Sequence, residues 1–243
     1  MIASLASGQP ASTGPAGVVV EIKDAIGPAT KDHFLRALAK AEEQRAELLV
    51  LVLDTPGGLD AAMRDMIQGI LNADVPVVTY VAPSGARAAS AGTYILYASH
   101  VAAMAPGTNL GAATPVPIGG APPPSPEPRK PAGAEEPKDA PAETPPSPGS
   151  ASDRKAVNDA VAYIRGLAEM RGRNVEWAEA AVRSAASLTA TDALAQDVID
   201  LVADDLPALI AALDGREVDV AGAKRTLRTE GLTLERFERD WRT

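Results

Sequence analysis

Ser90 lies among small residues, in a pattern that is typical of an exposed nucleophile. The run Ala88-Ala89-Ser90-Ala91-Gly92 follows the apolar segment VPVVTYV, at the point where a helix is expected to begin. This A-x-S-x-G pattern is similar to the G-x-S-x-G turn, whose small neighbours permit a tight strand-to-helix turn that exposes the serine hydroxyl. A helix N-terminus also offers N–H groups and a positive dipole to a developing oxyanion. The other interpretation is a plain N-cap or a closely packed helix, because serine is a common cap.

Gly57 and Gly58 end a second turn with potential chemistry. They follow the continuous apolar run LLVLVL, in the sequence DTPGG. Ligands of open α/β sheets bind beyond the carboxyl ends of the strands. Glycines at such a place let backbone N–H groups approach a substrate oxygen closely, because no Cβ is in the way. A strand-to-helix turn that only needs a positive φ is the other interpretation.

A nucleophilic serine needs a base, and the candidates are His33, His100 and Lys155. His33 lies beside Asp32 on an expected helix and His100 lies directly before an expected strand, but no spacing places a partner carboxylate for either. A lysine is the other kind of base, provided that burial lowers the pKa of its amine. Lys155 begins an amphipathic helix, where a lysine side chain is ordinarily solvated.

The composition excludes several classes of function. The chain of 243 residues has 23 Lys+Arg against 32 Asp+Glu, a net charge of −9, which argues against a nucleic-acid partner. Because it has no cysteine, disulfides, thiolate zinc sites and a cysteine nucleophile are excluded. Aromatic residues make up only 3%, too few for a platform that stacks bases or sugars. No spacing implies a metal or an organic cofactor.

The elements that must position these residues alternate between strand and helix. Short apolar runs predict strands at 17–23, 48–53, 75–81, 101–105 and 198–202. Apolar residues at helical spacing predict helices at 30–45, 61–71, 88–98, 155–171, 174–184, 189–195 and 206–213. This alternation predicts an α/β fold with a mainly parallel sheet.

A proline-rich segment interrupts this pattern. Of the 21 prolines, 13 fall between Pro115 and Pro148. Residues 117–152 hold too little apolar surface to offset the entropy of ordering, so they are predicted to be a disordered loop. The loop is either a linker between two domains or an insertion within one. Because few strands follow it, we favour a single domain over residues 17–213.

The two ends of the chain are predicted to lie outside this domain. Residues 1–16 lack the basic and apolar regions of a secretory signal, so they are either the stub of a removed signal or a disordered lead. Residues 214–243 form a charged tail, expected as a hairpin or a loose end. No stretch approaches the roughly 18 to 20 consecutive apolar residues of a membrane span, so the chain as given is expected to be soluble.

Taken together, several motifs resemble the NfeD-type membrane serine proteases, in the Clp-protease/crotonase-like class beside the SppA-type signal peptide peptidases. These motifs are TPGG after a buried strand, then ARAASAGTYI and MAPGTNLGAATPV. The resemblance continues in KAVNDAVAYIRGLAEMRGRN and SLTATDALAQDVIDLVADDL, and covers about residues 17–115 and 153–213. It implies a spiral of parallel strands and helices in one domain, with the proline-rich loop as an insertion.

The resemblance also implies roles for individual residues. Ser90 of the ASAG motif is the implied nucleophile. Lys155, which heads the pattern K-x-x-N-D-A, is the implied base of a Ser-Lys dyad. Backbone N–H groups of Gly58 and Ala91 form the implied oxyanion hole.

Two further positions, Gly57 and Thr114, are expected to contact the substrate. Relatives of the Clp type use a histidine about 25 residues past the serine, where this chain reads GAATP at 111–115 with no histidine. That difference supports lysine as the base. Lys130 and Lys138 lie inside the proline-rich loop and are poorer candidates than Lys155.

The implied activity is hydrolysis of peptide bonds in apolar, membrane-derived segments, including the C-terminal region of a stomatin-like partner. A homodimer is expected by the same resemblance. Long members of the family carry a signal sequence and C-terminal membrane helices that are not in this sequence. The expected parent is therefore membrane-anchored, with this domain outside the cytoplasm and the charged tail close to the membrane segment.

Two other functions stay open at this point. An acyl-CoA enzyme of the crotonase type shares the fold and the oxyanion hole, but does not need Ser90 and Lys155 together. A non-catalytic membrane scaffold or interaction domain would keep the same motifs as packing features.

Overall fold

The computed structural model describes residues 16–116 and 151–238. The lead predicted for 1–16 and the disordered loop predicted for 117–152 therefore lie outside the described residues, apart from a residue or two at their ends. Both described segments contribute strands to each of the two larger sheets.

A six-stranded parallel sheet forms the centre of the fold, in the order β11-β1-β2-β3-β5-β8. Its strands are β1 (Ala16–Lys23), β2 (Leu49–Asp54), β3 (Val77–Val81), β5 (Val101–Met104), β8 (Leu201–Val202) and β11 (Thr233–Phe237). The apolar runs that predict β1, β2, β3 and β5 are buried almost throughout, because both faces of the sheet are covered. The predicted α/β fold with a parallel sheet is confirmed.

The described helices agree closely with the predicted ones. They are α1 (Pro28–Glu43), α2 (Asp60–Leu71), α3 (Ala91–Ala98), α4 (Ala151–Arg171), α5 (Val175–Arg183), α6 (Ala190–Ala195) and α7 (Leu206–Leu213). Two starts were predicted wrongly, and one of them is that of α4, which begins at Ala151 and not at 155. The helix expected at 88–98 begins only at Ala91, because the residues before Ser90 form a short strand instead.

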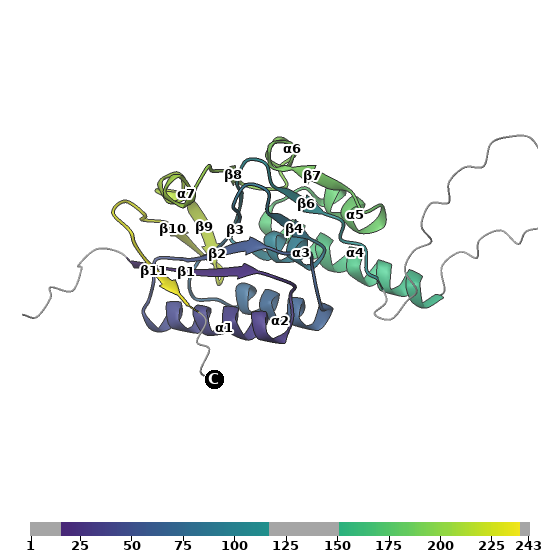
Figure 1. Ribbon diagram of the computed structural model, residues 1–243, viewed down its shortest axis with the longest axis horizontal. Helices are drawn as coiled ribbons and strands as arrows, with labels where there is room; N and C mark the ends of the chain where they lie inside the picture. The colour runs from purple at the N-terminus through teal and green to yellow at the C-terminus, as the bar shows by residue number, and fades with distance from the viewer. Residues whose placement is uncertain (1–15, 117–150, 239–243) are drawn as a thin grey trace, which may run out of the picture.

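Two hydrophobic clusters, one on each face of the sheet, hold the layers together. In β1, Val18 and Val20 belong to the cluster packed with α1 and α2, whereas Val19 belongs to the cluster packed with α7. Figure 1 shows α1 and α2 along one face of the sheet, with α7 on the other face. The central strands are therefore fixed from both sides, and their carboxyl ends are held in register.

A smaller sheet continues from the carboxyl end of β2. Its strands β4 (Arg87–Ala89), β6 (Asn109–Gly111) and β7 (Ser187–Thr189) lie in the order β4-β6-β7. Thr55, just past β2, links the two sheets: its N–H donates to the Arg87 carbonyl (2.7 Å) and its carbonyl accepts from the Ala89 N–H (3.1 Å). Strands of three residues are too short to show alternation, and the sequence predicts none of them.

Of the two forms predicted for the C-terminal residues, the hairpin is found, and the strand that follows it joins the main sheet. β9 (Glu217–Val220) and β10 (Ala223–Thr226) form an antiparallel hairpin, and β11 pairs with β1 along the edge of the main sheet. The domain boundary predicted at residue 213 therefore moves to the end of the described chain. β11 is charged because it is an edge strand with Glu235 and Arg236 exposed. Glu235 pairs with Lys40, while Leu234 and Phe237 pack against the two hydrophobic clusters.

No helix among residues 16–116 and 151–238 combines the length and the apolar character that crossing a bilayer requires.

Candidate active site

Ser90 stands at the junction of β4 and α3 in an unusual backbone conformation. It is the N-cap of α3, with φ 51° and ψ −115°. Its N–H donates to the Gly111 carbonyl of β6 (2.9 Å), and its carbonyl accepts from the Thr93 N–H (2.9 Å). A positive φ is uncommon in residues other than glycine, and strained residues held this firmly cluster at functional sites.

Small neighbours are required around this serine for steric reasons. A Cβ on Gly57 would lie 2.7 Å from the Ser90 Cβ and 3.1 Å from its Oγ. A Cβ on Gly92 would lie 2.7 Å from the Thr55 side chain. Both distances are shorter than real Cβ contacts, so only glycine lets the two turns approach each other. The structure thus places the predicted Gly57 directly against the predicted nucleophile.

Gly58 and Ala91, whose backbone N–H groups are the predicted oxyanion hole, line the same cavity as Ser90. Neither N–H has a hydrogen-bond acceptor within the part of the chain that the structure describes. Gly58 is held by a parallel bridge to Ile26, in which the Ile26 N–H donates to the Gly57 carbonyl and the Leu59 N–H donates to the Ile26 carbonyl, each at 2.8 Å. Two fixed donors beside a serine hydroxyl are the arrangement that stabilises an oxyanion.

The cavity has a volume of about 160 Å³ and a mostly apolar wall. Its lining residues come from α2, α3, α4 and the chain that follows β6: Gly58, Asp60, Met63, Arg64, Ser90, Ala91, Tyr94, Ala113, Pro115, Val116, Ala160 and Tyr163. Met63, Ala113 and Ala160 supply part of this apolar wall.

Two tyrosines form one side of the cavity. The rings of Tyr94 and Tyr163 are stacked with centroids 6.2 Å apart, and the Tyr94 hydroxyl donates to the Ala113 carbonyl (3.1 Å). Burial, with the nearby Asp60 carboxylate, raises the pKa of Tyr94 well above its ordinary value. The phenol therefore remains a protonated donor and holds Ala113 at the cavity wall.

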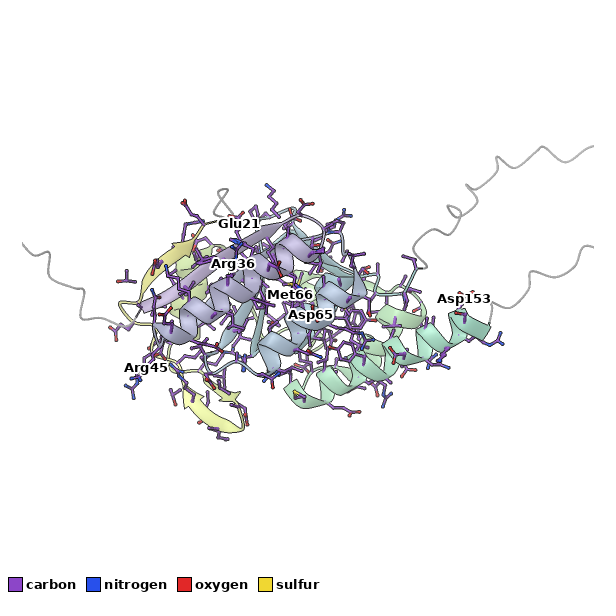
Figure 2. The ribbon with its side chains drawn as sticks, turned by 90° about the horizontal axis from the view of Figure 1, so that it is seen from below. Glu21, Arg36, Arg45, Asp65, Met66 and Asp153 are labelled. Atoms are coloured by element: carbon purple, nitrogen blue, oxygen red, sulfur yellow. The ribbon has the colours of Figure 1, made fainter. Side chains whose placement is uncertain are left out.

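Lys155 is not brought to Ser90 in this structure. It is exposed, and although Ala160 and Tyr163 of the same helix line the cavity, Lys155 does not. Figure 2 labels Asp153 on the end of α4 that extends beyond the rest of the fold. Ser90, Gly58 and Ala91 thus line one cavity, whereas the predicted base Lys155 stands on the projecting part of the helix.

The two histidines are placed away from the cavity. The His100 Nδ1 accepts from the Val77 N–H (3.0 Å), at the amino end of β3 and therefore at the opposite edge of the sheet from Ser90. Burial, with Arg171 and Arg173 nearby, lowers the pKa of His100 to about 3. His33 lies on α1 with its ring 5.3 Å from that of Phe237. Neither histidine is positioned to act as a base for Ser90.

The Thr114 hydroxyl is engaged within the fold. It donates to the Val182 carbonyl of α5 (2.6 Å), and the neighbouring residues Ala113 and Pro115 line the cavity instead. The hydroxyl is occupied in fixing the chain after β6 to α5, so any contact of this position with substrate would come from the backbone.

Sequence reasoning missed the residues that shape the cavity. Tyr94, Tyr163 and Arg64 come from three different helices, and nothing in their local sequence distinguishes them from core or surface residues. One usable signal was present. Tyr163 and Asp159 follow Lys155 at intervals of eight and four, which places all three on one face of α4.

A family model described as "NfeD1b, N-terminal domain" matches residues 17–122. Among curated proteins, the chain is 38% identical over 202 residues to the membrane-bound protease PH1510 of Pyrococcus horikoshii, an alignment that covers 83% of this chain and 40% of that protein. It is 36% identical over 96 residues to the membrane protein NfeD1b of Bacillus subtilis, covering 39% and 21%. The chain thus spans well under half the length of these curated relatives.

Solved structures show the same similarity. A serine-to-alanine mutant of the 1510-N membrane-bound stomatin-specific protease superposes with a TM-score of 0.76 at 35% identity, covering 93% of this chain and 99% of the other. A lysine-to-alanine mutant of the 1510-N protease, in complex with a substrate peptide, gives 0.76 at 34% identity and covers 94% of each chain.

Proposed function

Because this chain belongs to the NfeD N-terminal domain family, in which a solved relative is a membrane-bound protease, we propose that it is a serine endopeptidase with Ser90 as its nucleophile. The observation that carries the proposal is the shared cavity of Ser90 with the N–H groups of Gly58 and Ala91, neither of which has an acceptor among the described residues. A purely structural serine would not require two unpaired donors beside its hydroxyl.

In the proposed reaction, the Ser90 Oγ attacks the carbonyl carbon of a peptide bond while its proton passes to the neutral amine of Lys155. The carbonyl oxygen becomes an oxyanion that accepts from the N–H groups of Gly58 and Ala91. Collapse of the tetrahedral intermediate expels the amine product, which takes the proton from Lys155. Water then hydrolyses the acyl-enzyme by the same route.

Lys155 is the part of this proposal that depends on a change of position. It precedes Ala160, which lines the cavity, by five residues, a rise of about 7.5 Å along the helix. A lysine side chain is long enough to span most, but not all, of that distance. The proposal therefore requires the first turns of α4 to lie closer to Ser90 when substrate is bound.

The proposed substrate is an apolar segment of a membrane-associated protein. The cavity beside Ser90 is lined by Met63, Tyr94, Ala113 and Ala160, which favour an apolar side chain. The relative of known structure is described as stomatin-specific, so we propose a stomatin-like partner for this chain as well. Gly57 would then face the substrate backbone next to the reacting carbonyl.

We propose a membrane-anchored parent protein for this domain, because the relative that it matches is membrane-bound and longer. We also propose that the domain lies outside the cytoplasm and that it assembles as a homodimer. Size-exclusion chromatography with light scattering tests the dimer directly.

A non-catalytic scaffold of the same fold is the second candidate, and the exposed position of Lys155 favours it. The two candidate functions differ in whether the chain cleaves peptides. A library of apolar peptides is incubated with the parent chain and with Ser90→Ala, Lys155→Ala and the control Lys224→Ala, an exposed lysine paired with Glu217 on the hairpin. All variants are checked for folding by circular dichroism.

We expect cleavage by the parent chain and by Lys224→Ala, and its loss in Ser90→Ala and Lys155→Ala. Cleavage that survives Lys155→Ala alone would assign the base to another lysine, and Lys138→Ala tests that directly. Absence of cleavage by the folded parent, even at raised pH where a lysine is more often neutral, would favour the scaffold.

A further inference from the structure

Arg64 connects the two helices that flank the cavity. From α2, its Nε donates to Asp60 (2.8 Å) in the first turn of the same helix, and its Nη2 donates to Asp159 of α4 (2.6 Å). Its guanidinium also lies 4.3 Å from the centre of the Tyr163 ring. One side chain thus joins two carboxylates and an aromatic wall of the cavity.

The position of Asp159 on α4 gives this contact its significance. Asp159 follows Lys155 by four residues, so the two side chains lie on the same face, one turn apart. Oppositely charged residues at this spacing attract each other in an exposed helix. Without a competing cation, the Asp159 carboxylate would be one turn from the Lys155 ammonium and could pair with it, although an acid that follows the base pairs less strongly than one that precedes it.

We propose that Arg64 is a positioning residue that occupies the Asp159 carboxylate, which keeps it from pairing with Lys155 while it ties α4 to α2. This inference rests on the proposed role of Lys155 as the base. A lysine paired with a carboxylate is held as an ammonium and cannot accept the proton of Ser90. Engaging Asp159 with a guanidinium removes that obstacle without removing the charge that ties α4 to α2.

Other charged groups near this face do not substitute for Arg64. On α2, Asp65 pairs with Lys31, which leaves Asp60 and Arg64 as the charges facing α4. On α5, Glu179 pairs with both Arg183 and Arg165. α3 contributes no charged residue, and on α4 itself Asp153 and Arg154 flank Lys155 within the same exposed turn.

The ion pair is not explained by stability alone. The Arg64 and Asp159 side chains are 34% and 67% exposed, and ion pairs this exposed contribute little to folding. If the pair served only to hold α4, the hydrophobic contacts of Ala160, Val161 and Ile164 in the core would make it redundant. Its consequence is therefore expected in the reaction and not in the unfolding curve.

The test is the pH dependence of kcat/KM for an apolar peptide. In Arg64→Gln, Asp159 is released to pair with Lys155, and the acid limb is expected to move to higher pH by about 0.3 to 0.5 pH unit, from the strength of an exposed pair four residues apart and the loss of a nearby cation. Activity below the midpoint then falls about two- to threefold. In the double variant Arg64→Gln with Asp159→Asn, the acid limb is expected to return toward that of the parent.

Arg165→Gln is the matched control, because Arg165 lies on the same helix as Lys155 and, like Arg64, pairs with a carboxylate of a neighbouring helix, that of Glu179. Its acid limb is expected to stay in place. An Arg64→Gln profile lowered equally at every pH, and not restored by Asp159→Asn, would mean a merely structural role and would overturn the proposal.

A failure of the proposed function is recognised separately. If Ser90→Ala or Lys155→Ala retains cleavage, the dyad itself is wrong. If both abolish cleavage while Arg64→Gln keeps the parental midpoint, the dyad stands and the role of Arg64 is refuted. A second readout needs no turnover: the rate at which Lys155 is acetylated by acetic anhydride, followed by mass spectrometry in the Ser90→Ala background, should fall at neutral pH in Arg64→Gln and recover in the double variant.

Discussion

Replacing Gly58 by alanine tests the oxyanion hole most directly, because the structure defines what the added methyl group meets. Its Cβ would lie 2.0 Å from the Ile26 carbonyl oxygen and 2.6 Å from the Ile26 nitrogen. Real Cβ atoms essentially never approach closer than 3.0 Å. The turn must therefore move by about 1 Å, and the Gly58 N–H moves with it.

The expected cost to catalysis follows from that displacement. A donor moved by about 1 Å no longer reaches the oxyanion at hydrogen-bonding distance, and loss of one such donor lowers kcat about 100- to 1000-fold, or about 3 to 4 kcal/mol of barrier. Since the interaction exists only in the transition state, kcat and kcat/KM should fall together while KM stays nearly constant. Strain at the Ile26 bridge should also lower the free energy of unfolding by about 1 to 3 kcal/mol.

The assay pairs steady-state cleavage of an apolar peptide with urea denaturation, and adds the affinity for a peptide aldehyde, which forms a tetrahedral adduct with the serine. Gly27→Ala is the control. It lies beside the same Ile26, has a φ of −149°, and a Cβ there meets nothing within 4 Å. Gly27→Ala should keep the parental kcat. A Gly58→Ala enzyme that loses stability yet keeps kcat within about threefold would refute Gly58 as an oxyanion donor.

Two further predictions concern the substrate cavity and a buried histidine. Ala160→Leu should fill part of the cavity of about 160 Å³. On a panel of peptides, kcat/KM should fall at least about tenfold for those with a large apolar residue before the scissile bond, while peptides with alanine at that position are still cleaved. Equal losses for the two kinds of peptide would place the substrate side chain elsewhere. Burial and the nearby Arg171 and Arg173 lower the pKa of His100 to about 3, so the unfolded chain, with an ordinary value near 6.5, binds the proton first. His100 therefore imposes no penalty above pH 6.5, and the free energy of unfolding falls as the pH drops from about 6.5 toward 3. Urea denaturation should show a shallower fall in His100→Gln, and identical slopes would contradict this reasoning.

The central strands are predictable because burial on both faces leaves an unbroken apolar run. In β2, Leu49 and Leu51 belong to one hydrophobic cluster and Val50 belongs to the other, so positions on both faces of the sheet select apolar residues. β11 shows the opposite case. It is an edge strand whose exposed positions carry charge, and its partner β1 lies at the other end of the sequence. No local sequence pattern indicates a pairing over this distance, so the prediction of a hairpin or a loose end includes the β9–β10 hairpin but not β11.

The start of α3 was predicted wrongly for a different reason. Residues 87–89 are small or helix-compatible, and their local preference continues the helix backward through Ser90. The structure instead pairs β4 with β6 and with Thr55, and these tertiary hydrogen bonds hold Ser90 at its positive φ. Tertiary contacts override local preference at the residue proposed as the nucleophile, which is where strain is expected to be stored.

The proposed site divides into a part set by backbone turns and a part set by a helix surface. Ser90, Gly58 and Ala91 act through atoms fixed by buried turns, and their glycine and alanine neighbours are visible in the sequence because only small residues fit. Lys155 acts through a long side chain on the projecting end of α4, and its position depends on how α4 is held against α2. The contacts that hold α4 against α2 run from Arg64 to Asp159 and Tyr163. They join residues about a hundred positions apart, so no local sequence pattern predicts them. The oxyanion hole should therefore tolerate substitutions on α4, whereas delivery of the proton acceptor should respond to them.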